Sequence, residues 1–212
     1  MVKLSSTEEE YTEFLSSLWQ RYKYLLLLSV VLIGGGVVGW DAWTKNQTQN
    51  FQESSDLYEE FIDSLNNQDS DEKLIADQII NKHPNTLYAD LVSLHLAKIS
   101  AETDDLNAAE KHLKWVLKRH EKKWSSDFDP IEITARIRLA RVLLAKESPE
   151  EALEIINQAK EKNSALYEVK GDAEELLGQF DEARLSYLKA LESTQNQSIR
   201  ALLQMKLSSL EG

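Results

Sequence analysis

Tyr24-Leu25-Leu26-Leu27-Leu28-Ser29-Val30-Val31-Leu32-Ile33-Gly34-Gly35-Gly36-Val37-Val38-Gly39-Trp40 is an apolar run without a charged side chain. The rest of the chain is polar and acidic. An apolar run of this length is not left exposed to water unless a large core buries it. As a helix rising about 1.5 Å per residue, the run spans about 25 Å, and Trp43 extends it to about 30 Å, close to the hydrocarbon thickness of a bilayer. Residues 24–43 are therefore predicted to form a single transmembrane helix.

Aromatic rings flank the run on both sides, as is typical where rings sit at the level of lipid headgroups. Arg21 and Lys23 lie directly before the run, whereas Lys45 is the only cation that follows until Lys73. This bias favours a cytoplasmic N-terminus and places residues 44–212 outside the cytoplasm, which is the periplasm if the source is a Gram-negative bacterium. The rings are Trp19, Tyr22 and Tyr24 before the run and Trp40 and Trp43 at its end.

A cleaved signal peptide is the competing interpretation of the same run. Three features favour an uncleaved anchor. The preceding leader is long and carries four glutamates, the run is longer than a signal peptide needs, and no Ala-x-Ala site follows it. Val37-Val38-Gly39 is only a weak substitute for such a site.

The leader, residues 1–23, has an apolar stripe at helical spacing and is predicted to form a short amphipathic helix at the cytoplasmic membrane surface. Ser6 with Glu9, or Thr7 with Glu10, could form a capping box at its start. Its acidic side does not suit anionic lipid, so a cytoplasmic regulatory partner and a helix resting in the interface both remain open. The stripe consists of Tyr11, Phe14, Leu15, Leu18, Trp19 and Tyr22.

Gly35 and Gly39 form a small-xxx-small pair within the run. Glycines at this spacing let a second membrane helix approach closely. These two residues are therefore candidates for packing against another membrane protein.

Composition limits what the remaining chain can do. The net charge is −12, from 24 basic and 36 acidic side chains, and residues 41–212 account for −11 of it. Such a domain repels phosphates, which argues against nucleic acid as a partner. The absence of cysteine excludes thiol catalysis, disulfides and cysteine metal sites.

Helical periodicity dominates the region after the run, and alternation typical of strands is nearly absent. The membrane helix is expected to continue to about Asn66, because no proline or glycine interrupts it. Further helices are predicted at 71–82, 85–102, 106–122, 130–146, 149–160, 165–177, 180–193 and 198–210.

Residues 164–197 resemble a tetratricopeptide repeat of 34 residues, centred on Gly171-Asp172-Ala173-Glu174-Glu175-Leu176-Leu177-Gly178-Gln179-Phe180-Asp181-Glu182-Ala183-Arg184-Leu185-Ser186-Tyr187-Leu188-Lys189-Ala190-Leu191. The resemblance implies that small residues lie where paired helices press together and that a glycine ends the first helix. Tyr167 stands where the family often has Trp, and the closing proline is replaced by Gln195. The matching positions are Gly171, Ala173, Gly178, Ala183, Tyr187 and Ala190.

Two earlier units match the repeat more loosely, through Ala97 with Ala109 and Ala140 with Ala152. Their turns are predicted to be about two residues longer than the turn at Gly178. The helix at 198–210 would cap the stack. The expected fold class is all-α: one transmembrane helix followed by a tetratricopeptide-like α-solenoid.

No motif for catalysis, metal binding or cofactor binding is found, so we expect a non-catalytic protein without cofactor or metal. His95 is expected to be packed or to line a groove, whereas His112 and His120 are expected to be solvated among lysines. Adjacent acids such as Glu174-Glu175 are interpreted as solvated helix faces.

A basic cluster interrupts the acidic domain in the helix at 106–122. Cations near a helix C-terminus complement its dipole, and this interpretation is favoured. The alternative is a docking patch for acidic lipid or an acidic partner protein. The cluster consists of Lys111, Lys114, Lys118 and Arg119, together with His120, Lys122 and Lys123, and has Trp115 and Trp124 beside it.

The whole layout resembles the ancillary subunit of the bacterial Sec translocon, a family often called YfgM-like. The resemblance implies an inner-membrane protein with a periplasmic repeat domain, associated with SecYEG and with a membrane-anchored, foldase-like chaperone of the PpiD type. It also implies a role in passing translocated polypeptides to periplasmic chaperones, no catalytic residues, and a regulatory contact through the leader. The matching segments are Val38-Gly39-Trp40 with Trp43, Asn85-Thr86-Leu87-Tyr88-Ala89, Leu94-His95-Leu96-Ala97, Arg136-Ile137-Arg138-Leu139-Ala140-Arg141-Val142, Gly171-Asp172-Ala173 and Leu203-Gln204-Met205-Lys206-Leu207.

Two functions from different classes remain. One is an adaptor at the translocon. The other is a periplasmic scaffold that coordinates cell-envelope or division proteins without contacting the translocon.

Overall fold

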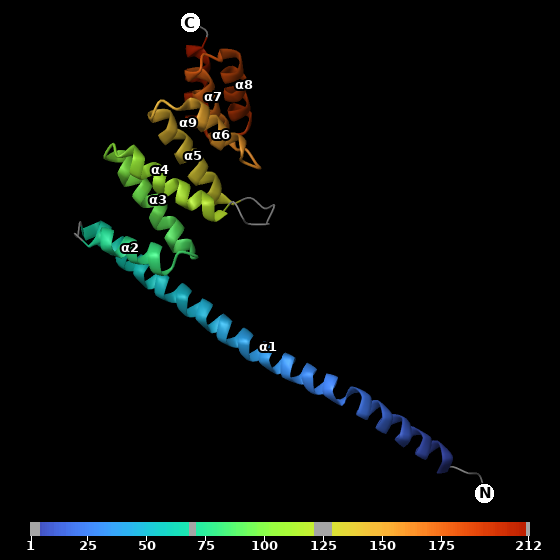
Figure 1. The fold of residues 1–212 in the computed structure, drawn as a ribbon. Helices are drawn as coiled ribbons and strands as arrows, with labels where there is room; N and C mark the ends of the chain where they lie inside the picture. The colour runs from blue at the N-terminus through green and yellow to red at the C-terminus, as the bar shows by residue number, and fades with distance from the viewer. Residues whose placement is uncertain (1–4, 68–70, 121–128, 211–212) are drawn as a thin grey trace. The chain divides into compact units, whose positions relative to one another are not determined.

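The computed structural model describes residues 5–67, 71–120 and 129–210, and every element in these ranges is a helix (Figure 1). The all-α prediction is therefore confirmed. Side chains at 5–10, 12, 13, 17, 26 and 30 lie outside the description, as do residues 121–128. The predicted capping box at Ser6 or Thr7 and the cluster members Lys122, Lys123 and Trp124 consequently fall outside the described part. The chain divides into two compact units, Met1–Glu53 and Ser54–Gly212.

Helix α1, Ser5–Asn67, begins in the first unit and is continuous. The leader is helical as expected, but it is not a helix of its own, because no proline separates it from the apolar run. The expected continuation of this helix to about Asn66 is confirmed.

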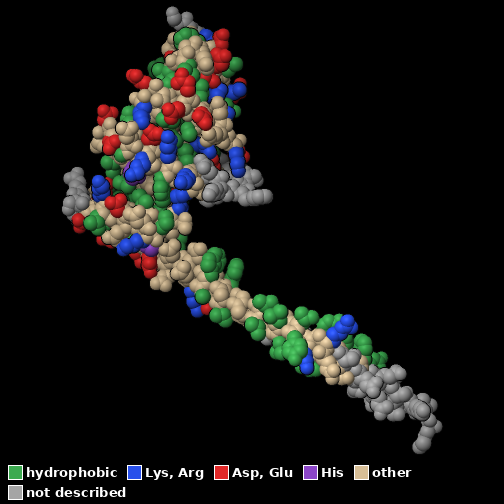
Figure 2. All heavy atoms as spheres, viewed as in Figure 1, with side chains coloured by type: hydrophobic (Ala, Val, Ile, Leu, Met, Phe, Trp, Pro, Cys, Tyr) green, Lys and Arg blue, Asp and Glu red, His purple; other side chains and the backbone are tan. Residues whose placement is uncertain are grey.

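The apolar run of α1 is bare in the structure. Within the described residues, α1 is the single helix long and apolar enough to cross a membrane, and none of its most apolar window is buried. Figure 2 shows its apolar side chains exposed along the helix. A Cβ added at Gly35 or Gly39 would meet no atom within 4 Å, so both glycines leave room for close approach.

In the second unit, α2 to α9 follow one another, and neighbours in the chain pack together from α2 to α9. Apolar faces supply the packing, and side-chain caps at Thr86, Asp129, Asn163 and Asn196 fix the starts of α3, α5, α7 and α9. The helices are α2 Glu72–Lys82, α3 Leu87–Glu102, α4 Leu106–His120, α5 Pro130–Ala145, α6 Pro149–Asn157, α7 Ser164–Leu176, α8 Phe180–Glu192 and α9 Gln197–Ser209.

The same three-residue turn joins α3 to α4, α5 to α6 and α7 to α8. Asp104, Glu147 and Gly178 have φ of 63°, 58° and 72° at equivalent positions. The next amide donates back to the preceding helix each time, as from Ser148 N to Leu143 O at 2.9 Å. The prediction of longer earlier turns was wrong, because an acidic residue adopts the left-handed conformation there without a glycine to mark it.

The packing of the last pair depends on a close approach at Gly171. A Cβ there would lie 2.4 Å from Cε1 of Tyr187, whose ring is fully buried. Ala183 and Ala190 are fully buried in one cluster with Tyr187, and Ala173 is fully buried on α7, whereas Gly178 is exposed at the turn. Small residues thus let α7 and α8 pack around one large ring.

Candidate partner-binding groove

Two adjoining pockets lie along α3 and α5 in the second unit, and they share Lys98 and Arg138. The larger measures about 500 Å³ and the smaller about 280 Å³. We call this combined feature the α3–α5 groove. The larger pocket is lined by Ala97, Lys98, Ala101, Glu102, Leu106, Leu113, Arg138, Arg141, Val142 and Ala145.

Both helices of the groove are fixed at their starts. Thr86 accepts a hydrogen bond from the Ala89 amide at 3.4 Å at the start of α3. Asp129 accepts from the amides of Ile131 and Glu132 at 3.0 and 3.3 Å at the start of α5. These caps satisfy amides that a helix leaves unpaired, and they fix where α3 and α5 begin.

The floor of the groove is apolar because small side chains leave space between larger ones. Ala97, Ala101 and Ala145 line the larger pocket beside Leu113 and Val142. An aliphatic side chain of a partner would remove this surface from water, which is the main driving force of such contacts.

Three cations surround the floor. Within the described residues, their contacts to carboxylates are long or absent. Lys98 Nζ lies 3.7 Å from Glu102 Oε1, and Arg141 Nη2 lies 3.5 Å from Glu168 Oε2. The Lys98 and Arg141 side chains are 57% and 53% exposed, so solvent screens these pairs. Arg138 donates to the Leu94 carbonyl at 2.9 Å. The groove is thus locally basic in a unit whose 20 basic and 30 acidic side chains give a net charge of −10.

His95 lines the smaller pocket, in agreement with the expectation of a packed or groove histidine. Its ring packs edge-on against Phe61 at 5.5 Å between centroids. Partial burial lowers the pKa of His95, Lys98 and Arg138 lower it further, and Glu72 and Glu102 oppose them.

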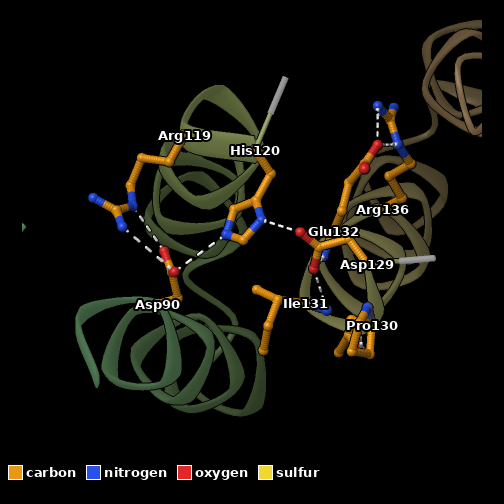
Figure 3. A network of polar contacts seen from close by, with 9 residues as sticks. Asp90, Arg119, His120, Asp129, Pro130, Ile131, Glu132 and Arg136 are labelled. Carbon is orange, nitrogen blue, oxygen red and sulfur yellow. Dashed lines mark hydrogen bonds and ion pairs between the residues drawn. The ribbon is translucent and has the colours of Figure 1, made fainter. Parts of the chain in front are cut away.

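A buried polar network joins α3, α4 and the start of α5 (Figure 3). His120 lies between two carboxylates, with Nδ1 2.6 Å from Asp129 Oδ2 and Nε2 3.1 Å from Asp90 Oδ2. Arg119 Nε donates to Asp90 Oδ1 at 2.8 Å. The prediction that His120 is solvated was wrong, because its partners come from distant positions in the chain, and His112 is half-buried as well.

The basic cluster on α4 is not a uniform surface of open charges. Lys114 Nζ lies 2.5 Å from Glu110 Oε1, and Arg119 lies over the Trp115 ring at 4.9 Å while pairing with Asp90. Hydrogen bonds from Lys114 and Lys146 lower the pKa of Glu110. Lys111 and Lys118 are exposed on the same helix.

The polar side chains near α7 and α9 pair with one another. Lys206 Nζ lies 3.2 Å from Glu168 Oε1 and 2.5 Å from Asp172 Oδ1. The Tyr187 hydroxyl donates at 2.7 Å to Asp172 or Glu175, and burial, followed by these two hydrogen bonds, raises its pKa.

Glu174 departs from its sequence interpretation. Its carboxylate is buried, pairs with Lys170 at 2.6 Å, and accepts a hydrogen bond from the Ser186 hydroxyl at 2.5 Å. The prediction of a solvated face was therefore wrong at Glu174. Among the described residues, no group of three or more His, Asp or Glu side chains could hold a metal ion.

A family model described as a tetratricopeptide repeat-like domain matches residues 16–212. The chain is 31% identical over 209 residues to the ancillary SecYEG translocon subunit of Aggregatibacter actinomycetemcomitans, covering 96% of this chain and 97% of that protein. This chain belongs to the ancillary SecYEG translocon subunit family. No solved structure matches it significantly.

Two further relatives carry the same name. The ancillary SecYEG translocon subunits of Haemophilus influenzae and Neisseria gonorrhoeae are each 26% identical to this chain and cover 97% and 96% of it. The resemblance found in the sequence is thus confirmed over nearly the whole chain. Members of the ancillary translocon subunit family are generally non-catalytic tetratricopeptide-like proteins, and the described residues of this member include one candidate membrane helix.

Proposed function

We propose that this chain is a membrane-anchored, non-catalytic adaptor at the Sec translocon. Similarity to ancillary SecYEG translocon subunits over nearly the full length of each protein carries the proposal. The exposed apolar run of α1 and the open α3–α5 groove supply the two surfaces that such an adaptor needs.

The proposed orientation places residues 1–23 in the cytoplasm, 24–43 across the inner membrane and 44–212 in the periplasm. Arg21 and Lys23 before the apolar run support this direction. In the structure these cations lie over the rings of Tyr22 and Tyr24, at 6.0 and 5.2 Å. Ring and cation together suit the headgroup level on the cytoplasmic side.

The groove would bind a membrane-anchored chaperone of the PpiD type and so help to pass translocated proteins to periplasmic chaperones. The groove supports this role because it combines an apolar floor with cations whose contacts to carboxylates of the same chain are long. An apolar centre with a charged rim is the usual layout of a protein-binding surface.

Crosslinking in intact membranes tests the proposal. A photoreactive side chain at Gly35 or Gly39 should crosslink to translocon subunits or to the chaperone. Val37 points to the other side of the helix and serves as the matched control. Crosslinks to a second copy of the chain alone, or co-purification with envelope scaffold proteins without SecYEG, would contradict the adaptor function.

A further inference from the structure

We propose that the α3–α5 groove selects a partner segment in which carboxylate side chains flank aliphatic ones. The carboxylates would pair with Lys98, Arg138 and Arg141, and the aliphatic side chains would fill the larger pocket. This inference deepens the proposed adaptor function and rests on it.

Arg138 is the central recognition residue, because it lines both pockets, as Lys98 does, and its guanidinium can bind a carboxylate through two nitrogens. One of its nitrogens donates to the Leu94 carbonyl, and within the described parts of the chain it has no carboxylate partner. A guanidinium carries five N–H donors in a fixed fork, so donors remain for a carboxylate. The bond to Leu94 holds the fork at the junction of the pockets.

Lys98 and Arg141 extend this positive rim. Their contacts to Glu102 and Glu168 are 3.7 and 3.5 Å, longer than a good charged hydrogen bond of about 2.8 Å. An incoming carboxylate can therefore pair with them without first breaking a strong internal pair.

The apolar floor of the groove makes a ligand with charged groups alone a poor fit. Ala101, Leu106 and Val142 lie among the cations, and the pocket of about 500 Å³ falls within the range that buries an organic ligand. Burial of aliphatic carbons adds to the ion pairs, so a segment with both features binds better than one with either.

Other charged surfaces of the unit fit this chemistry less well. On α4, Lys114 and Arg119 already have close carboxylate partners. Near α9, Lys206 is shared between Glu168 and Asp172. Among the described pockets, those of the α3–α5 groove combine exposed cations with an apolar lining.

The test uses the full chain in phosphatidylcholine nanodiscs and fluorescence polarisation of a labelled twelve-residue peptide of leucine and glutamate. Lysine in place of glutamate, and serine in place of leucine, should each weaken binding at least tenfold. The Lys98→Glu/Arg138→Glu variant should also lose at least tenfold. Lys111→Glu/Lys118→Glu changes the charge equally on α4 and should bind as the parent does.

A second variant keeps the charge unchanged. Ala101 is exposed at the pocket wall, so Ala101→Trp should block the pocket and weaken binding while the helices keep their circular dichroism. Equal binding of the glutamate and lysine peptides, or equal losses in the groove and α4 variants, would overturn the inference. So would groove variants that abolish binding to phosphatidylglycerol vesicles while no peptide binds, because the ligand would then be a membrane.

The two proposals fail separately. Loss of the Gly35 and Gly39 crosslinks with intact peptide selectivity would contradict the translocon role alone. Intact crosslinks without peptide selectivity would contradict the groove chemistry alone.

Discussion

The last helix pair, α7 and α8, differs from the two earlier pairs in how its residues solve the same geometric problem. All three pairs use one turn with a left-handed residue, which is Gly178 in the last pair and Asp104 or Glu147 in the others. The helix pairing therefore dictates the backbone, and the residue at the turn adapts to it. Glycine marks the turn but does not create it.

The polar groups of these regions differ as well. Around α7 and α9, Lys206 and Tyr187 are bound to carboxylates at 2.5 to 3.2 Å, so this end satisfies itself. Along α3 and α5, the cations have distant partners or a backbone carbonyl. The α7–α9 end thus contributes stability, whereas the α3–α5 groove is available for binding.

The largest expected effect is at the close contact of the last pair. Gly171→Ala should destabilise the protein by about 3 kcal/mol, because the new Cβ would overlap a buried ring that hydrogen bonds hold in place. The measurement is the urea midpoint of the full chain in detergent micelles, followed by circular dichroism. A loss below about 1 kcal/mol would show that Tyr187 can move aside.

The helix caps give the next effect. Asp129→Ala should cost about 2 kcal/mol, because it removes both the cap of α5 and the carboxylate beside His120. Asn163→Ala, which removes only the cap of α7, should cost about 1 kcal/mol. Equal midpoints in urea for these two variants would show that the contact to His120 adds no stability.

The turns predict changes of opposite sign. Glu147→Gly should stabilise the protein by about 0.5–1 kcal/mol, because glycine adopts a positive φ without strain. Gly178→Ala should destabilise it by about 1 kcal/mol, since its Cβ meets no atom and only the φ of 72° is unfavourable. Thermal unfolding of both variants measures this, and destabilisation by Glu147→Gly would refute the equivalence of the turns.

The smallest expected effect is the pH dependence of stability caused by His95, which lines the smaller pocket of the groove. The folded pKa of His95 lies below 6.5, the ordinary value, so its contribution to stability is complete above pH 6.5 and is lost as pH falls through the folded value. His95→Gln should therefore reduce the loss of stability on acidification. Urea midpoints of the parent and the variant from about pH 7.5 to about pH 5 measure the difference. Identical pH profiles would contradict the assignment.

The sequence was sufficient for the helices and for the last repeat, because periodicity, prolines and Gly178 are local signals. It was insufficient for Glu174 and His120, whose partners, Ser186 and Asp90, lie 12 and 30 residues away in the chain. The groove could not be predicted from the sequence either, because its larger pocket is lined by alanines from both α3 and α5. The sequence indicated a docking patch in the basic cluster of α4, where Lys114 and Arg119 are paired with carboxylates. The cations with long contacts, Lys98 and Arg141, lie on α3 and α5.

The acidic residues at the left-handed turn positions have a consequence for how such chains are compared. A census of repeats based on the consensus glycine would register Gly178 and overlook the units closed by Asp104 and Glu147. Two thirds of these turns would then vanish from the count while the backbone retained all three. Divergent relatives can accordingly differ in apparent repeat number and still share one architecture.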